Sequence, residues 1–228
     1  MPRPLRPLLL AFLLLAADPA QAVILVFQNG VGGYAGADNQ SYSFDGLQSF
    51  DTLYFDYPSF GQPEGRYAWL LFGGLIGPDA IPPGATIRRA RVEGWVQNPF
   101  GSATITRLLD DIANRPPWIH TVPGTFYDDT QAVSAAHGDS CQSFDVCEPP
   151  LPIAWDVTAS VQSWADGAPN HGFLILPETT DGGALHPTDD PSTTLRPRLV
   201  VTAVPEPGGA LGACAVLALA ALRSRAPR

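Results

Sequence analysis

The stretch Arg89-Ala90-Arg91-Val92-Glu93-Gly94-Trp95-Val96 has the clearest two-residue period in this chain of 228 residues. Its small and apolar side chains would share one face of a β-strand: Ala90, Val92, Gly94 and Val96. Its charged and aromatic side chains would share the other face: Arg89, Arg91, Glu93 and Trp95. Such alternation is typical of an antiparallel sheet that packs on one face and meets water on the other.

Short apolar runs bounded by turn residues recur on both sides of this stretch. The strand is entered through the turn Ile81-Pro82-Pro83-Gly84-Ala85. We expect further strands at Val23–Phe27, Ser49–Tyr57, Arg66–Phe72, Phe100–Leu109, Ile153–Val157, Phe173–Leu176 and Leu199–Thr202. Between two of them, Asp110–Pro152 is rich in Asp, Pro, Gly and Ser and predicts a long loop.

One segment, about Thr158–Ala165, has helical spacing, with Val157, Val161 and Trp164 at i, i+4 and i+7. Asp156 or Thr158 can cap its N-terminus, and Gly167 lies near the position that ends a helix in the left-handed region. The sequence therefore predicts an all-β fold, an antiparallel β-sandwich or jelly roll with one short helix.

The first 22 residues have the pattern of a secretory signal peptide. Arg3 and Arg6 precede the apolar run Leu8–Ala17, and Ala20-Gln21-Ala22 supplies a small-x-small cleavage site. We expect the mature protein to begin near Val23.

At the other end, Pro205-Glu206-Pro207 precedes the uncharged run Gly208–Leu222 and a tail with three arginines. As a transmembrane helix this run would reach about 22 Å, short of the ~30 Å hydrocarbon core. The arrangement resembles the PEP-CTERM sorting signal of Gram-negative bacteria that make extracellular polysaccharide. The resemblance implies that residues 204–228 hold the chain in the inner membrane transiently, until an exosortase-type enzyme processes it at Pro205, Glu206 and Pro207.

Residues 23–203 remain as one domain, long enough to bury a sizeable core. This segment has eight arginines, no lysine and 20 acidic residues, hence a net charge of −12. Such acidity argues against nucleic acid and anionic membranes as partners, because both attract basic surfaces. The domain contains two cysteines, Cys141 and Cys147, which in an exported protein predict a disulfide closing a small loop. Zinc is the alternative, although two cysteines alone cannot supply its four ligands.

Four fragments of the domain resemble the DNRLRE-type family. They are Arg66–Phe72, Ile81–Ala90, Trp155–Gly172 with Asp156-Val157-Thr158 and Val161-Gln162, and Arg196-Pro197-Arg198-Leu199. The resemblance implies an exported β-sandwich related to alginate-binding carbohydrate modules. Phe72 is followed by Gly-Gly where the family has Asp-Leu, and Asp110–Pro152 matches no motif of the family. Most of the shared positions are typical of turns, caps and core residues.

Catalytic motifs are weak in this sequence. Gly138-Asp139-Ser140 superficially matches a hydrolase nucleophile block, but no buried strand precedes it. The four histidines are scattered among loop residues, and each is most simply a surface residue: His120, His137, His171 and His186. We therefore expect no enzymatic activity, with a polysaccharide lyase or hydrolase as the remote alternative.

Two kinds of ligand site remain open. Asp128-Asp129 and Asp189-Asp190 lie among oxygen-rich neighbours and could help to bind a structural Ca²⁺, or could be solvated charge. Trp95, Trp118, Phe126 and Tyr127 could stack on sugar rings, and Trp95 could instead be buried beneath the long loop. The leading hypothesis is an exported, non-catalytic protein associated with extracellular polysaccharide. The alternative is a structural or adhesive matrix protein that recognises no sugar.

Overall fold

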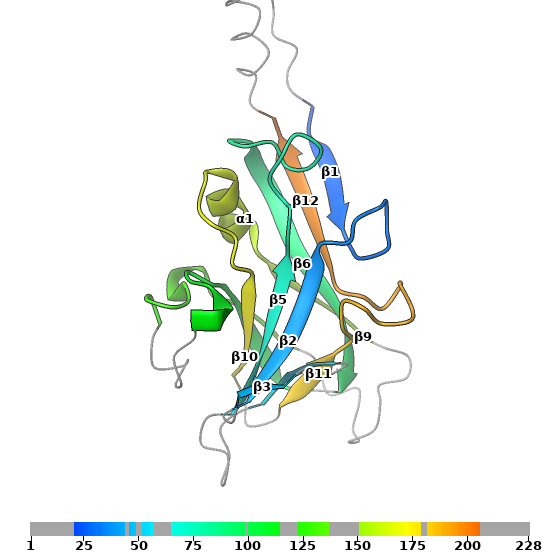
Figure 1. The fold of residues 1–228 in the computed structure, drawn as a ribbon, viewed down its shortest axis with the longest axis vertical. Coiled ribbons are helices and arrows are strands. Elements are labelled where there is room, and N and C mark those ends of the chain that lie inside the picture. The colour runs from blue at the N-terminus through cyan, green and yellow to red at the C-terminus, as the bar shows by residue number, and fades with distance from the viewer. Residues whose placement is uncertain are drawn as a thin grey trace, which may run out of the picture. The chain divides into compact units, whose positions relative to one another are not determined.

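Two antiparallel sheets form the part of the chain that the computed structural model describes, namely residues 21–43, 46–48, 52–56, 65–98, 100–114, 123–136, 151–178 and 182–205. Sheet A has the strand order β1 (Val23–Phe27), β12 (Arg198–Val204), β6 (Thr86–Asn98), β11 (Gly183–Leu185), β4 (Leu53–Phe55). In this sheet β12 and β11 pair with successive parts of one edge of β6, and β9 (Leu151–Asp156) pairs with its opposite edge. Sheet B has the order β3 (Gly46–Gln48), β2 (Ala37–Ser43), β5 (Arg66–Phe72), β10 (Phe173–Pro177), β7 (Ser102–Arg107), β8 (Val133–Ala136). This confirms the predicted antiparallel β-sandwich (Figure 1).

The core lies between the sheets and follows the predicted alternation. On β6, Ala90, Val92 and Val96 are at most 1% exposed, whereas Arg89 on the opposite face is exposed. Phe72 of β5, in sheet B, belongs to the same cluster of buried side chains. Trp155 of β9 is fully buried, and its Nε1 donates to the carbonyl of Ala103 on β7, at 3.0 Å. That bond ties sheet A to sheet B, and the indole gives the core its largest fully buried side chain.

A β-bulge interrupts β6 near its start. Thr202 of β12 pairs with Arg89, but the next residue, Ala203, pairs with Ile87, so Arg88 is an extra residue. The bulge lets both Ile87 and Ala90 point into the core. Two side chains of the helix α1 (Thr158–Ala165) accept hydrogen bonds from the backbone on either side of it. Ile87 N donates to Oε1 of Gln162, at 2.7 Å, and Ala90 N donates to Oγ1 of Thr158, at 2.9 Å.

The helix begins and ends nearly as predicted. Asp156 accepts hydrogen bonds from the N–H and the hydroxyl of Thr158, although the N-cap position itself is occupied by Val157. Gly167 has φ +104° and donates to the carbonyl of Trp164, while Ala168 donates to that of Ser163, which is a Schellman motif. Asp156, Thr158 and Gly167, which belong to the fragment that resembles the DNRLRE-type motif, therefore have structural roles in this fold.

A second apolar cluster covers the outer face of sheet B. Tyr42 and Tyr67 stack there with ring centroids 5.3 Å apart, and Trp69 and Leu174 lie beside them. Phe126 and Tyr127 pack against the same cluster. The segment after β7 thus covers one side of sheet B with buried aromatic rings.

One prediction about a loop was wrong, and one strand was not predicted. Asp110–Pro152 contains β8, which pairs with β7, and includes the first residues of β9; the short run Val-Ser-Ala-Ala is too weakly apolar to indicate an edge strand. β2 was not predicted because its inward positions are polar. Ser41 donates to the carbonyl of Thr52 and accepts from Tyr54 N, so its hydroxyl is satisfied inside the sandwich.

Among the described residues, no helix is long and apolar enough to cross a membrane. The predicted signal peptide lies almost wholly outside these residues, as do Gly208–Leu222, Cys141, Cys147, His120 and His137.

Trp155→Phe should lower the free energy of unfolding by about 2–4 kcal/mol, because it leaves a cavity and a buried, unpaired carbonyl at Ala103. Urea unfolding followed by circular dichroism measures this. Trp95→Phe, the same change at a half-buried position, is the control and should cost less than about 1 kcal/mol. Equal losses in the two variants would contradict the assigned role of Trp155.

Candidate functional site

Trp95 lies on the outer face of sheet A, where the pattern of β6 placed it. It is half-buried, and Arg198 from the neighbouring strand lies over its ring with Cζ 5.3 Å from the centroid. Nε of Arg198 also donates to Oε2 of Glu93, at 2.8 Å. The guanidinium is therefore held between a carboxylate and an aromatic face, an arrangement that orients both side chains.

An open pocket of about 400 Å³ lies beside this pair. Trp95 and Arg198 form its sheet side, Gln28 and Val31 form another side, and residues 193–195 form its rim. Trp95 adjoins the connection between β11 and β12 there. Trp95 thus lines an open pocket beside the side chains of Thr193 and Thr194.

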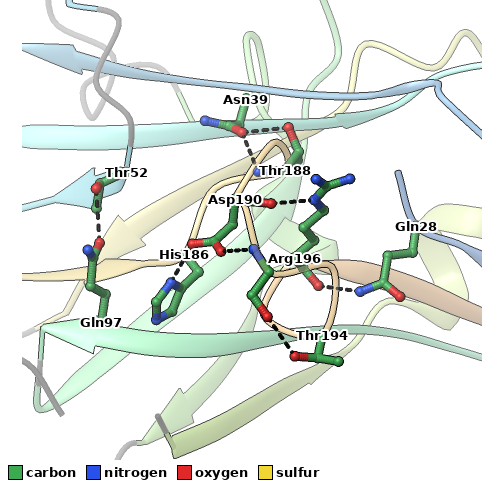
Figure 2. A network of polar contacts seen from close by, with 10 residues as sticks. Gln28, Asn39, Thr52, Gln97, His186, Thr188, Asp190, Thr194 and Arg196 are labelled. Atoms are coloured by element: carbon green, nitrogen blue, oxygen red, sulfur yellow. Dashed lines mark hydrogen bonds and ion pairs between the residues drawn. The ribbon is translucent and has the colours of Figure 1, made fainter. Parts of the chain in front are cut away.

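The connection between β11 and β12, residues 186–197, is fixed by buried polar contacts (Figure 2). His186 is 8% exposed, and its Nδ1 lies 2.8 Å from Oδ2 of Asp190. Arg196 donates to the carbonyl of Asp190 at 2.7 Å. The prediction that His186 is a surface residue was therefore wrong, because the loop folds back on its own side chains.

Residues from the other end of the chain hold the same loop from outside. Nε2 of Gln28 donates to the carbonyls of Thr193 and Arg196, at 2.9 and 2.7 Å. Asn39 of β2 accepts from the N–H and the hydroxyl of Thr188, at 2.7 and 2.6 Å (Figure 2). With so many fixed contacts, the pocket rim is ordered before any ligand arrives, which lowers the entropic cost of binding.

The predicted calcium residues have other partners in the structure. Asp128 forms an ion pair with Arg107, Oδ2 to NH2 2.7 Å, and its other oxygen accepts from Thr130. Asp190 is engaged with His186, whereas Asp129 and Asp189 are exposed. No group of three or more His, Cys, Asp or Glu that could hold a metal occurs within the described ranges. The calcium site stays a prediction, which a comparison of the melting temperature in EDTA and in calcium would test.

Of the predicted aromatic platform residues, the structure gives an open position to Trp95. Phe126 and Tyr127 are 5% and 6% exposed within the outer cluster of sheet B, so their rings have no free face for a sugar. Trp118 lies outside the described residues, as do Glu206 and Pro207. Pro205 directly follows the last residue of β12, Val204.

A second pocket, of about 520 Å³, lies between the start of α1 and residues 130–133. Its lining contains no aromatic ring; small and polar side chains such as Thr130, Ala132 and Ser160 predominate. It lacks the stacking surface that distinguishes the pocket at Trp95.

Sequence reasoning placed Trp95 on the outer face of its strand but missed its surroundings. Arg198, Gln28 and residues 193–195 reach the pocket through strand register and through contacts between residues more than 160 positions apart. The signal present in the sequence was compositional: the run 186–197 is rich in Asp, Pro, Ser and Thr, residues that often form fixed turns.

No protein-family model matches the chain, and no curated protein matches it in sequence. The fold and the pocket therefore carry the functional argument.

Asp128→Asn should lower the free energy of unfolding at pH 7 by about 1–3 kcal/mol, because Arg107 loses a charged partner in a mostly buried position. Burial raises the pKa of Asp128, but the hydrogen bonds from Arg107 and Thr130 outweigh it and leave the pKa below its ordinary value. The stabilisation is thus complete above the ordinary carboxyl pKa and is lost as the pH falls through the lowered one.

Urea unfolding of wild type and variant between pH 7 and pH 2 measures this difference, which should shrink in acid. Asp129→Asn, at the exposed neighbour, is the matched control and should change stability by less than about 0.5 kcal/mol. A difference that does not depend on pH would exclude the ion pair as its cause.

Proposed function

We propose that this chain is an exported, non-catalytic β-sandwich protein that associates with extracellular polysaccharide through the pocket at Trp95. The observation that carries the proposal is the half-exposed indole on a flat sheet face, beside a rim of threonines fixed in advance. Such a ring offers an apolar face to the C–H side of a sugar. The hydroxyls of Thr193 and Thr194 are suited to sugar hydroxyls, whereas the N–H groups of the Gln28 amide are already used to hold the loop.

The distribution of arginines supports binding to an acidic as well as a neutral polymer. The domain is acidic as a whole, but Arg198 lies at the pocket and Arg91 lies on the same outer face of β6. A guanidinium binds a carboxylate with two parallel hydrogen bonds, which makes arginine suitable for uronic acids.

The cellular location of the protein is part of the same proposal. The sequence before Val23 has the pattern of a signal peptide, and Pro205-Glu206-Pro207 with the following apolar run resembles a PEP-CTERM signal. We infer transient attachment to the inner membrane, processing by an exosortase-type enzyme, and a final location at the surface or in the extracellular matrix of a Gram-negative bacterium. The DNRLRE-like fragments support the carbohydrate assignment.

A structural or adhesive role in the matrix is the second candidate. Its support is an edge of sheet A, where β1 pairs with β12 alone among the described strands. Edge strands with apolar side chains can pair with other chains. A protein that acted in this way would bind matrix protein and not sugar.

Trp95→Ala should weaken polysaccharide binding about tenfold, because stacking on the indole contributes on the order of 1 kcal/mol or more. Affinity electrophoresis of the purified protein in gels containing alginate and other acidic and neutral polysaccharides measures this as reduced retardation. Unretarded migration of the wild type with every polymer would favour the adhesive role. New reducing ends or unsaturated products would instead indicate an enzyme.

Two arginine variants with the same change of charge provide the control. Arg198→Gln removes the cation at the pocket, whereas Arg88→Gln removes an exposed one at the bulge. If the pocket binds an acidic polymer, the first variant should reduce retardation severalfold and the second only slightly. Equal effects would mean that binding is diffuse and electrostatic, and would place no site at Trp95.

A further inference from the structure

The large apolar side chains that are exposed in the described part of the chain gather at one place. They are Val23, Ile24, Val26 and Val31, all on β1 or just after it. Ile24 is 70% exposed and Val26 43%. Because Phe27 and Leu25 pack against the core, Ile24 and Val26 project from the outer face of sheet A. A soluble protein usually has such side chains singly, so the cluster indicates an interaction surface.

Strand register places arginines next to these apolar side chains. Ile24 lies opposite Thr202, and Thr202 lies opposite Arg89. The bulge in β6 exposes Arg88 beside Arg89, and neither makes an ion pair within the described ranges. We call Ile24, Val26, Arg88 and Arg89 the β1 face. It combines apolar and basic side chains on one side of an acidic protein.

The chain enters and leaves the sandwich at the β1 face. Val23, the first residue of β1, pairs with Ala203, and β12 ends one residue later (Figure 1). The sequence beyond these points contains the apolar runs Leu8–Ala17 and Gly208–Leu222. Whichever run is held in a membrane, a short connection leads from it to the β1 face.

We propose that the β1 face rests on an anionic lipid bilayer while the C-terminal run holds the chain in the membrane, an inference that relies on the sorting part of the proposed function. Ile24 and Val26 enter the boundary between headgroups and acyl chains, and Arg88 and Arg89 pair with lipid phosphates. The contact need not be strong by itself, because attachment through Pro205 keeps the face at a high local concentration near the bilayer.

The net charge of the domain does not prevent this contact. Exposed charges farther away than about 10 Å are largely screened at 0.1 M salt. Glu93 on the same face is paired with Arg198. Asp156 keeps its charge near Arg89 and Arg91, but Arg88, Arg89 and Arg91 together outnumber it. The acidity of the whole domain argues against anionic membranes as partners, and the proposal concerns this basic face alone.

A second copy of the chain fits the β1 face less well than lipid. Pairing along the edge of sheet A would use the backbone of β1 and leave the outward side chains of Ile24 and Val26 uncovered. A bilayer satisfies both kinds of side chain at once.

The test uses the full chain inserted into lipid nanodiscs, either of phosphatidylcholine alone or with about a third of phosphatidylglycerol. Hydrogen–deuterium exchange is followed by mass spectrometry in peptides that cover Val23–Phe27 and Arg198–Val204. Exchange at β1 should be severalfold slower in the anionic discs, because the docked face restricts opening of the edge strand. Equal exchange in the two compositions would overturn the proposal.

Variants separate this surface from the pocket at Trp95. Arg88→Gln with Arg89→Gln, and Ile24→Ser with Val26→Thr, should each abolish the difference between discs. Arg198→Gln, a charge change at the pocket, should leave it intact. Slow exchange in both disc compositions that depends on protein concentration would show a second copy as the occupant, contrary to the proposal.

A failure of the sorting proposal can be distinguished from a failure of the proposal about the β1 face. If the chain does not insert into discs, the same protein is floated with vesicles of the two compositions. Association at least severalfold greater with the anionic vesicles, lost in the Arg88→Gln/Arg89→Gln variant, would still support the β1 face. Equal flotation with both would overturn it.

Discussion

The structure depends on β6, which hydrogen-bonds to three strands at once. β12 pairs with its first half, β11 with its end, and β9 along its other side. Each of these pairs requires the two-residue alternation of β6 to keep its register, because a slip by one residue would exchange the core face with the outer face. The bulge at Arg88 interrupts the pairing with β12, and the side chains of Thr158 and Gln162 bond the backbone there. The helix therefore stabilises the irregular start of β6 through hydrogen bonds to its backbone.

The same strand creates the surface that we associate with function. With the core on the Val92 side, Trp95, Glu93, Arg91 and Arg89 must all lie on the outer face of sheet A. Two residues of β12 complete this outer face: Arg198 lies beside Glu93, and Thr202 lies beside Arg89. One end has an aromatic ring in a polar pocket, and the other has aliphatic side chains next to arginines. Polysaccharide and lipid contacts can thus occupy different parts of one face, which fits a protein that leaves a membrane to join a matrix.

Much of the fold could be predicted from the sequence. The strands at Val23–Phe27 and Arg66–Phe72, the helix and its terminating Gly167 all follow from local patterns, and the structure confirms them. β2 and β8 could not be predicted in this way. The inward Ser41 is stabilised by hydrogen bonds to another segment, and β8 is an edge strand of small residues. A strand that relies on its neighbours for hydrogen bonds has no apolar period of its own.

For the candidate site, the sequence by itself determined that Trp95 lies on the solvent side of a strand, because side chains alternate across a sheet whatever the fold around it. Only the tertiary structure decided that Trp95 keeps an open face while Tyr127 is buried, since burial depends on which loop covers which sheet. It also decided that Asp128 pairs with Arg107 and Asp190 with His186, although composition alone made them look like free carboxylates. The total charge is a property of the sequence. The gathering of arginines on one face is a consequence of strand register, which brings together residues that are more than a hundred positions apart.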